Sequence, residues 1–280
     1  MFSIFIASFV ANAYVAEECR DFASSGPPEG WSQDDEVAQQ DFLLNYFSLA
    51  TTFSPAHAPI PGLPGEGMVG VELSVIPPLG CDRRLVLFYT KTEDTNKVPV
   101  LPRPRLSFTF PSIQMGPVKG TIYGSLGYVP PLPLMGTQNV IVSAEAGIGF
   151  GEPEENGLQY GLRYHATLLK TVAEIATPFE EGAETMPDFY MGSTFGGDVL
   201  FGYKSNNFTP YLAVGFTDVS TFFYIDDDGI VINNKSPYQG LVASVGTQWR
   251  PTSNIQVSAE LYSAPGYITT GRLNLGLLFK

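Results

Sequence analysis

The chain lacks any run of about twenty apolar residues, the length that a helix needs to cross a bilayer. This excludes a helical membrane protein, although 44% of the 280 residues are apolar. Charged residues make up only 15% of the chain, and the acidic ones predominate, so the net charge is −13. An acidic chain repels phosphate backbones, and nucleic acid is therefore not expected as a partner.

Histidine and cysteine are scarce, with two of each. The sequence contains no cluster of cysteine and histidine at metal-ligand spacing, no phosphate-binding loop and no dinucleotide fingerprint. The acidic run Asp226-Asp227-Asp228-Gly229 lacks the alternating spacing and the distal Glu of a calcium loop, which favours a hairpin turn. We therefore expect no metal and no cofactor.

Glycine (29), proline (23) and aromatic residues (20 Phe, 14 Tyr, 2 Trp) are plentiful, a mixture typical of many short strands joined by turns. From Met68 onward, stretches of about ten residues alternate apolar and polar side chains, which is the length of a tilted transmembrane strand. Ten such stretches occur, near residues 69–75, 105–110, 118–128, 140–148, 158–168, 198–203, 211–216, 241–249, 255–261 and 272–279.

The connections between these stretches alternate in length. The even-numbered ones are short, whereas the odd-numbered ones include the long segments 77–102, 170–194 and 218–239. Outer-membrane barrels show this asymmetry, with their short turns facing the periplasm. The sequence predicts an antiparallel up-and-down β-barrel of ten strands in residues 67–280, located in the outer membrane. Twelve strands is the alternative, because Arg83–Tyr89 could be a further strand and residues 219–232 a hairpin.

Two segments precede the barrel. Residues 1–13 have an apolar core that ends in Ala11-Asn12-Ala13, the small-x-small pattern of a signal-peptidase site, and are predicted to be a cleaved signal peptide. Residues 14–66 are acidic and include a Pro-rich linker that contains His57. The apolar spacing within Asp34–Ala50 predicts an amphipathic helix, which we expect at the periplasmic mouth or inside the lumen.

Some stretches resemble known barrels. Leu273-x-Leu275-x-Leu277-x-Phe279 resembles the terminal signal by which outer-membrane barrels are recognised for assembly. This makes the assembly machinery an expected partner, beside outer-membrane lipid and lipopolysaccharide. Four further stretches resemble a family of uncharacterised bacterial outer-membrane β-barrel proteins: Phe47–Gly65, Lys91–Arg105, Tyr128–Pro133 and Glu260–Thr270. The resemblance implies fold and location, and it carries no activity and no site residues.

The polar face of the strands carries acids and bases in balanced number. A barrel of this size has little room beyond its side chains, and an unpaired buried ion is costly, so charges there need partners. We expect Glu145 to pair with Arg163, and Arg272 to neighbour both Glu260 and Glu72, in a largely plugged lumen. The full inward set is Glu72, Arg105, Lys119, Glu145, Arg163, His165, Asp198, Glu260 and Arg272.

The only two cysteines, Cys19 and Cys81, would reach an oxidising compartment, where disulfides form. Cys19 starts on the periplasmic side, whereas Cys81 follows the first strand and should be extracellular. A disulfide between them requires the N-terminal segment to thread through or around the barrel. The sequence alone leaves this pairing open.

The leading functional expectation is a barrel without catalysis that has a structural, interaction or narrow-conduit role. The alternative is binding or passage of a small hydrophobic molecule at an apolar rim. Three odd-numbered connections carry apolar, Pro-rich sequence that would form this rim: Ile76–Leu79, Val129–Leu134 and Ala264–Tyr267. The same residues could instead fold inward and close the barrel, since exposed apolar patches are unfavourable.

A second alternative is a hydrolase in which His165 acts as a base with Asp188 or Asp198 near the extracellular rim. A lipid-facing phospholipase site is not supported, because the outward neighbours of His165 are apolar or aromatic. We favour His165 as a member of a lumenal polar network.

Overall fold

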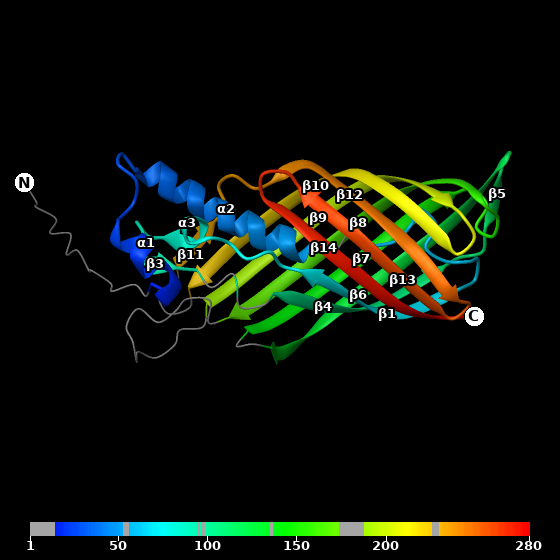
Figure 1. The fold of residues 1–280 in the computed structure, drawn as a ribbon, viewed down its shortest axis with the longest axis horizontal. Helices are drawn as coiled ribbons and strands as arrows, with labels where there is room; N and C mark the ends of the chain where they lie inside the picture. The colour runs from blue at the N-terminus through cyan, green and yellow to red at the C-terminus, as the bar shows by residue number, and fades with distance from the viewer. Residues whose placement is uncertain are drawn as a thin grey trace, which may run out of the picture.

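Ten strands close into an antiparallel barrel in the computed structural model, which describes residues 15–52, 56–93, 96, 99–134, 137–173, 188–225 and 230–280 (Figure 1). Each barrel strand pairs with its neighbours in sequence, and β1 pairs with both β4 and β14, which closes the sheet. The strands are β1 (Gly67–Val75), β4 (Val100–Thr109), β6 (Val118–Leu134), β7 (Thr137–Phe150), β8 (Gly157–Ala173), β9 (Asp188–Lys204), β10 (Phe208–Ile225), β12 (Gln239–Thr252), β13 (Ile255–Ala264) and β14 (Ile268–Phe279). The predicted ten-stranded barrel is confirmed, and the predicted signal peptide lies outside the described residues.

Four short strands lie outside this ring. β5 (Ile113–Met115) pairs with β6, and β11 (Ile230–Asn233) pairs with β10 as the second arm of a hairpin. The segment Arg83–Tyr89 is not a barrel strand. It contributes to α3 (Cys81–Arg84) and to β2 (Leu85–Val86), which pairs only with β3 (Lys91–Thr92). The twelve-stranded alternative is therefore wrong for the described residues.

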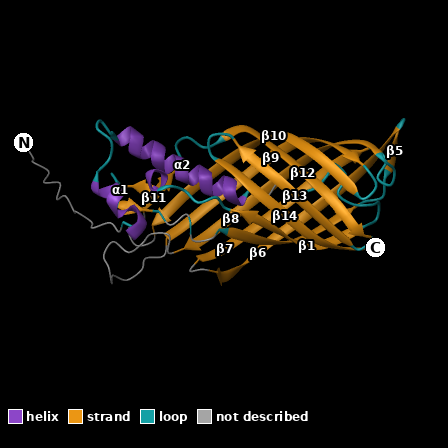
Figure 2. Ribbon diagram, viewed as in Figure 1, coloured by secondary structure: helices purple, strands orange, loops and turns teal. Residues whose placement is uncertain are grey.

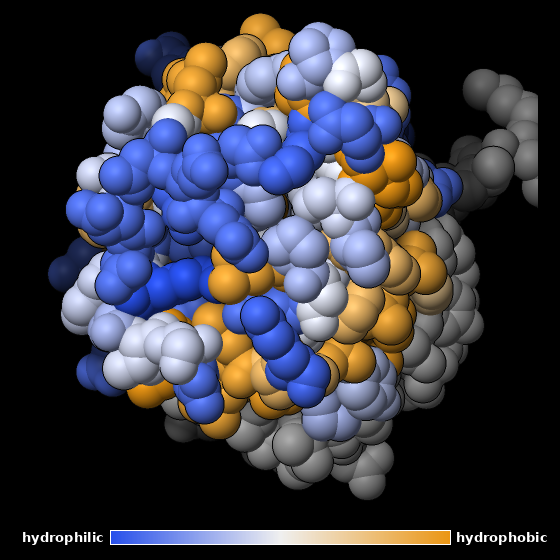
Figure 3. All heavy atoms as spheres, turned by 90° about the vertical axis from the view of Figure 1, so that its right-hand side faces the viewer, coloured by the Kyte–Doolittle hydropathy of each residue, from blue (hydrophilic) through white to orange (hydrophobic). Residues whose placement is uncertain are grey.

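The outward side chains of the barrel strands are mostly apolar and exposed. A soluble protein rarely exposes a continuous apolar surface of this kind, whereas a barrel in lipid requires one. Figure 3 looks onto the end that carries the short turns and the C-terminus, where hydrophilic residues gather and hydrophobic residues lie beside them on the flank. The protein is an integral outer-membrane β-barrel.

The N-terminal residues form η1 (Glu17–Cys19), α1 (Arg20–Ser24) and α2 (Gln33–Thr51). α2 covers the predicted helix Asp34–Ala50 and begins at a reciprocal cap: Ser32 Oγ accepts from Asp35 N at 3.3 Å, and the Asp35 carboxylate accepts from Ser32 N at 2.8 Å. The Ser32 hydroxyl also donates to the Asp35 carboxylate at 2.6 Å, and this bond, together with the one from Ser32 N, holds the pKa of Asp35 below its ordinary value. Among the described residues, no helix is long and apolar enough to cross a membrane.

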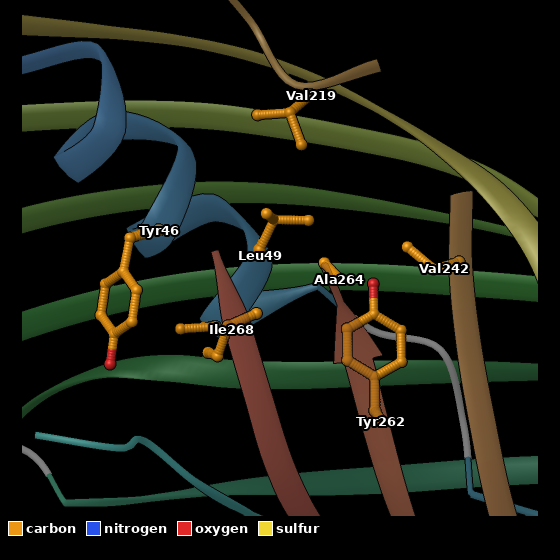
Figure 4. Packing of buried hydrophobic residues seen from close by; sticks show 8 residues of the cluster. Tyr46, Leu49, Val219, Val242, Tyr262, Ala264 and Ile268 are labelled. Carbon is orange, nitrogen blue, oxygen red and sulfur yellow. The ribbon is translucent and has the colours of Figure 1, made fainter. Parts of the chain in front are cut away.

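α2 lies at the end of the barrel that carries the long connections, and its C-terminal half enters the lumen there (Figures 1 and 2). Tyr46 and Leu49 pack in a buried cluster with residues of β10, β12, β13 and β14, among them Val219, Val242 and Ile268 (Figure 4). Because short turns face the periplasm, this is the extracellular end. The helix therefore enters the lumen and does not lie at the periplasmic mouth.

Residues 56–66, hereafter the linker, continue from α2 toward the periplasmic start of β1 at Gly67. The linker is buried from Ala56 to Gly62. It fits because inward positions on the facing strands are glycine: a Cβ on Gly149 would lie 2.4 Å from Pro59 O, and one on Gly202 would lie 2.9 Å from Pro59 Cδ. The N-terminal segment thus threads the barrel, and glycines leave room in the wall where it passes at Pro59.

A disulfide joins Cys19 and Cys81 at the extracellular end, with a Cα–Cα distance of 5.4 Å. The structure therefore contains the bond that the sequence left open, by the route through the lumen. The N-terminal segment is consequently held at two points, by the disulfide outside and by its continuation into β1 inside. We call residues 15–42 and 77–93, which surround the disulfide, the cap.

Replacing Cys19 with Ser should loosen the cap and leave the barrel closed. Loss of a native disulfide in a small unit typically costs ~2–4 kcal/mol, so we expect thermolysin to cleave the cap of Cys19→Ser faster than that of the wild type. Cys81→Ser should behave identically. Equal cleavage rates in the oxidised wild type and both variants would contradict this role for the bond.

Candidate functional site

The inward charges form ion pairs across neighbouring strands. In the group on β1, β4 and β7, Arg103 Nη2 lies 2.5 Å from Glu72 Oε1, and Arg105 bridges Glu72 at 3.7 Å and Glu145 at 3.1 Å. Ser125 on β6 also donates to Glu145, at 2.6 Å. All five side chains are buried, so each acid is compensated by a base on an adjacent or nearby strand.

Two bases of the wall also hold the end of α2. Arg103 donates to the carbonyl oxygens of Thr51 at 3.1 Å and Thr52 at 3.0 Å, and Arg272 donates to Thr52 O at 3.2 Å. The last carbonyls of a helix have no partners within it, and the C-terminus of the helix dipole favours a cation. Side chains of the barrel wall therefore satisfy the C-terminal carbonyls of the helix that fills the lumen.

The acids of the same group bind the linker. His57 Nε2 lies 2.5 Å from Glu145 Oε1, and Ala56 N donates to Glu72 Oε2 at 3.3 Å. Each carboxylate thus joins a base of the wall to a residue of the threaded segment. The ion-pair network therefore connects the barrel wall to the C-terminal half of α2 and the linker, which together we call the plug.

Polar side chains of β12 hold the linker near the periplasmic end. Gln248 accepts from Ala58 N at 3.1 Å and donates to Pro61 O at 3.3 Å. Arg250 donates to Pro61 O at 3.0 Å and forms an ion pair with Glu66 at 2.9 Å. The linker backbone is therefore hydrogen-bonded by the wall along its buried course.

A second charge group lies on β8 and β9, where Arg163 is the register partner of Asp198. Arg163 donates to Asp198 Oδ2 through Nε at 2.8 Å and contacts it through Nη2 at 2.7 Å. His165 Nε2 lies 3.5 Å from the same oxygen, and the ring packs against Gly196, where a Cβ would lie 2.4 Å from His165 Cε1. The imidazole is fully buried inside the barrel.

The third group lies on β13 and β14. Arg272 Nη1 is 3.6 Å from Glu260 Oε1, its register partner, and Tyr211 on β10 donates to Glu260 Oε2 at 3.1 Å. The Arg272 guanidinium also lies 3.9 Å from the centroid of the Tyr262 ring, a cation–π contact. The expected neighbourhood of Arg272 and Glu260 is therefore present.

The prediction that Lys119 faces the lumen is wrong. It lies at the periplasmic start of β6 and pairs with Glu152 in the following short turn at 2.7 Å, with both side chains 44% exposed. The alternation of polar and apolar residues in β6 continues beyond the end of the closed lumen, so a position that alternates as an inward one is exposed there.

Glu145 has partners other than the one expected. The register places His165 opposite Glu145 and Asp198 opposite Arg163. Glu145 forms its ion pairs with Arg105 on β4 and with His57 of the linker. The sequence placed Glu145 and Arg163 at equal heights, but strand register and the linker decide which side chains meet.

Three members of the network were missed. Arg103 lies between the predicted connection 77–102 and the predicted strand that starts at Arg105, although Arg103 and Arg105 already show the period of two. Arg250 was assigned to a short turn. His57 carried no charge pattern, and only the uncharged Pro-rich sequence around it, unusual for a solvated linker, could have indicated burial.

The charged groups of the lumen have almost no accessible surface. The exposed fractions are 0% for Glu72 and His165, 1% for Arg103 and 3% for Arg105 and Arg163. The wall of a water-filled pore would be exposed to solvent at such positions. Among the described residues, the lumen is therefore occupied by side chains and by the threaded segment.

The cap ends in an unusual turn between β2 and β3. Leu87, Phe88 and Tyr89 all have positive φ, at 52°, 54° and 67°, which costs bulky L-residues roughly 1–2 kcal/mol each. The buried Glu36 carboxylate stabilises this turn by accepting from Leu87 N at 2.5 Å and Phe88 N at 2.9 Å. Leu87 and Phe88 remain exposed at its tip.

Aromatic rings support this turn from below. Tyr89 is buried, with its ring 5.8 Å from Phe22 and 5.6 Å from Trp31, and the Phe22 ring is itself exposed. Elsewhere in the cap, Arg84 lies 2.9 Å from Glu18, and their hydrogen bond lowers the pKa of that carboxyl. Nothing local in the sequence marks a left-handed turn of large residues, so this aromatic tip could be recognised only in the structure.

No protein-family model and no curated protein matches the sequence. Solved structures with similarity include Ail, the attachment invasion locus protein of Yersinia pestis (13% identity, TM-score 0.28, 78% of this chain and 100% of that one). Others are the translocator domain of the autotransporter NalP from Neisseria meningitidis (9%, 0.37, 88% and 97%) and outer membrane phospholipase A from Escherichia coli (9%, 0.30, 77% and 96%). At these identities and scores, no role is transferred to this chain.

The described residues contain no group of three or more His, Cys, Asp or Glu side chains that could hold a metal ion.

Breaking the Arg103–Glu72 pair should destabilise the barrel. Arg103→Met removes the ion pair with the buried Glu72 carboxylate and the hydrogen bonds to Thr51 and Thr52. Losing one partner of a buried pair costs ~3–5 kcal/mol. We expect a clearly lower temperature for the loss of the folded form in heat-modifiability gels.

Lys119→Met is the matched control, because it removes the same kind of charge from an exposed ion pair that solvent screens and that contributes little to stability. It should unfold like the wild type. If both variants lost equal stability, the assignment of Arg103 to the lumenal network and Lys119 to the surface would be wrong.

Proposed function

We propose that this protein is a closed, non-conducting anchor that displays its N-terminal cap on the outside of the cell. The observation that carries the proposal is the course of the N-terminal segment, which fills the lumen and emerges at the end with the long connections. The same residues therefore close the barrel and carry the cap to its outer face.

Two layers close the lumen. Toward the outside, α2 packs in apolar clusters with the wall, which include Leu44, Ile141 and Leu169 on one side and Leu49 and Val219 on the other. Below them, the ion-pair network and the buried linker fill the remaining space. An ion crossing the barrel would have to displace both.

The plug is held too firmly for a simple gate. It is covalently continuous with β1 at Gly67, it is tied outside by Cys19–Cys81, and side chains of the wall bind its backbone at Thr52, Ala58 and Pro61. Movement would break several buried hydrogen bonds at once, each costly to leave unmade. These contacts support an anchoring role over a conduit role.

The rim supports the same conclusion. Ile76 and Leu79 pack against the buried cluster around α2, Val129 is buried in the other cluster, and Ala264 is fully buried. These apolar residues fold inward and pack against the plug. This favours closure of the mouth over a hydrophobic entry for a ligand.

We assign no catalysis to His165. A general base must reach the proton that it abstracts, and this imidazole is buried in the barrel between the Arg163–Asp198 pair and Gly196. Its position favours a packing role in the charge network.

Planar-bilayer recording and surface detection test the two halves of the proposal. Wild-type protein should give no steady current. An epitope inserted among the exposed residues near Glu29 should be detected by antibody on intact cells, whereas one inserted near Glu154, in a short turn, should require permeabilisation. Large steady currents, or an epitope at Glu29 hidden in intact cells, would overturn the proposal.

A substitution at Gly149 should open a leak, because a side chain there collides with the linker at Pro59. We expect Gly149→Val to lose stability or to show transient currents that the wild type lacks. Gly271→Val on β14 is the matched control, since a Cβ at Gly271 meets nothing within 4 Å. Equal behaviour of the two variants would show that the linker does not occupy the lumen beside Gly149.

A further inference from the structure

The exposed side chains of the cap include an apolar group, hereafter the apex, on a polar surface. Leu87, Phe88 and Phe22 are exposed by 41%, 43% and 43%, and they lie on or beside the strained turn. This apex belongs to the cap at the extracellular end, so lipid contact does not account for its exposure. Large exposed apolar residues grouped in this way mark interaction sites.

The backbone holds the apex in one shape. The consecutive positive φ values at Leu87, Phe88 and Tyr89 are maintained by the Glu36 carboxylate, which binds the turn. They are also maintained by the Tyr89 ring, which stacks on Phe22 and meets Trp31 edge-on. Strained conformations of this kind cluster at functional positions. A preorganised apex also loses little entropy when a partner binds.

Exposed charge in the cap is predominantly acidic. Two bases are exposed, and one of them, Arg83, lies over the Phe42 ring at 4.6 Å. Asp82 lies close enough to Tyr89 to affect it electrostatically. The exposed acids are Glu17, Glu18, Asp21, Glu29, Asp34, Asp35 and Asp82, against the bases Arg20 and Arg83.

From these observations we infer that the apex docks a basic polypeptide segment of another protein, one that carries apolar side chains between lysines or arginines. The apolar tip supplies the contact that excludes water, and the acidic surroundings select the charge of the partner. Anionic lipopolysaccharide and nucleic acid carry the wrong charge for this surface. The inference rests on the proposed display of the cap outside the cell.

The test uses the full oxidised protein in lipid nanodiscs and a phage-displayed library of random peptides. We expect enriched peptides to combine Lys or Arg with aliphatic or aromatic residues, and their binding to weaken as salt rises. The double variant Leu87→Gly with Phe88→Gly removes the apolar side chains and keeps the turn, because glycine adopts positive φ without strain. Its affinity for the enriched peptides should fall about tenfold or more, as for hot-spot residues.

A charge variant, Asp21→Asn with Asp82→Asn, should weaken binding and reduce its salt dependence, whereas Lys119→Met at the periplasmic end should bind as the wild type does. Enrichment of acidic peptides, equal binding to the glycine variant, or binding only to lipopolysaccharide or glycans would overturn the inference. These outcomes are separable from failure of the proposed function, which is measured by bilayer current and by the epitope near Glu29 without any peptide.

Discussion

Threading of the N-terminal segment through the barrel is the constraint on which the rest of the structure depends. Ten strands enclose more space than their own inward side chains fill at the positions of Gly149 and Gly202, and the linker occupies that space. The wall and the plug are consequently complementary parts of one interior. If the N-terminal segment stayed in the periplasm, the space beside these glycines would be left unfilled and the cap would not lie at the extracellular end.

The same constraint explains the use of buried charge. A buried ion pair contributes little net stability, but it is costly to break, so it specifies which arrangement is allowed. Arg103 shows this role, because it binds Glu72 of the wall and the last carbonyls of α2 at once. An apolar side chain at this position could pack, but it could not hold the end of the helix at a defined height.

The cap has too few residues to build a large core, and it depends on individual covalent and hydrogen-bonding interactions. Each part of it is held by one local interaction: the Cys19–Cys81 bond, the hydrogen bonds between Ser32 and Asp35 at the start of α2, or the Glu36 carboxylate. Their combined effect is a rigid outer surface on which three apolar side chains stay exposed. The contacts that stabilise the cap are therefore also the ones that keep these apolar side chains exposed.

Local pattern in the sequence was enough to determine the ten barrel strands and their orientation, because side chains alternate with a period of two and loop lengths differ at the two ends. The structure was needed to exclude the alternative of twelve strands. It also placed Glu72, Arg105, Glu145, Arg163, Asp198, Glu260 and Arg272 on the inward face. It did not reveal that Arg103 faces inward beside its prolines, or that Lys119 lies beyond the closed lumen. The partner of Glu145, the entry of α2 from outside and the left-handed turn at Leu87 were decided only by tertiary structure. The physical reason is that alternation is a property of neighbouring residues, whereas pairing across a lumen depends on strand register and on what threads it.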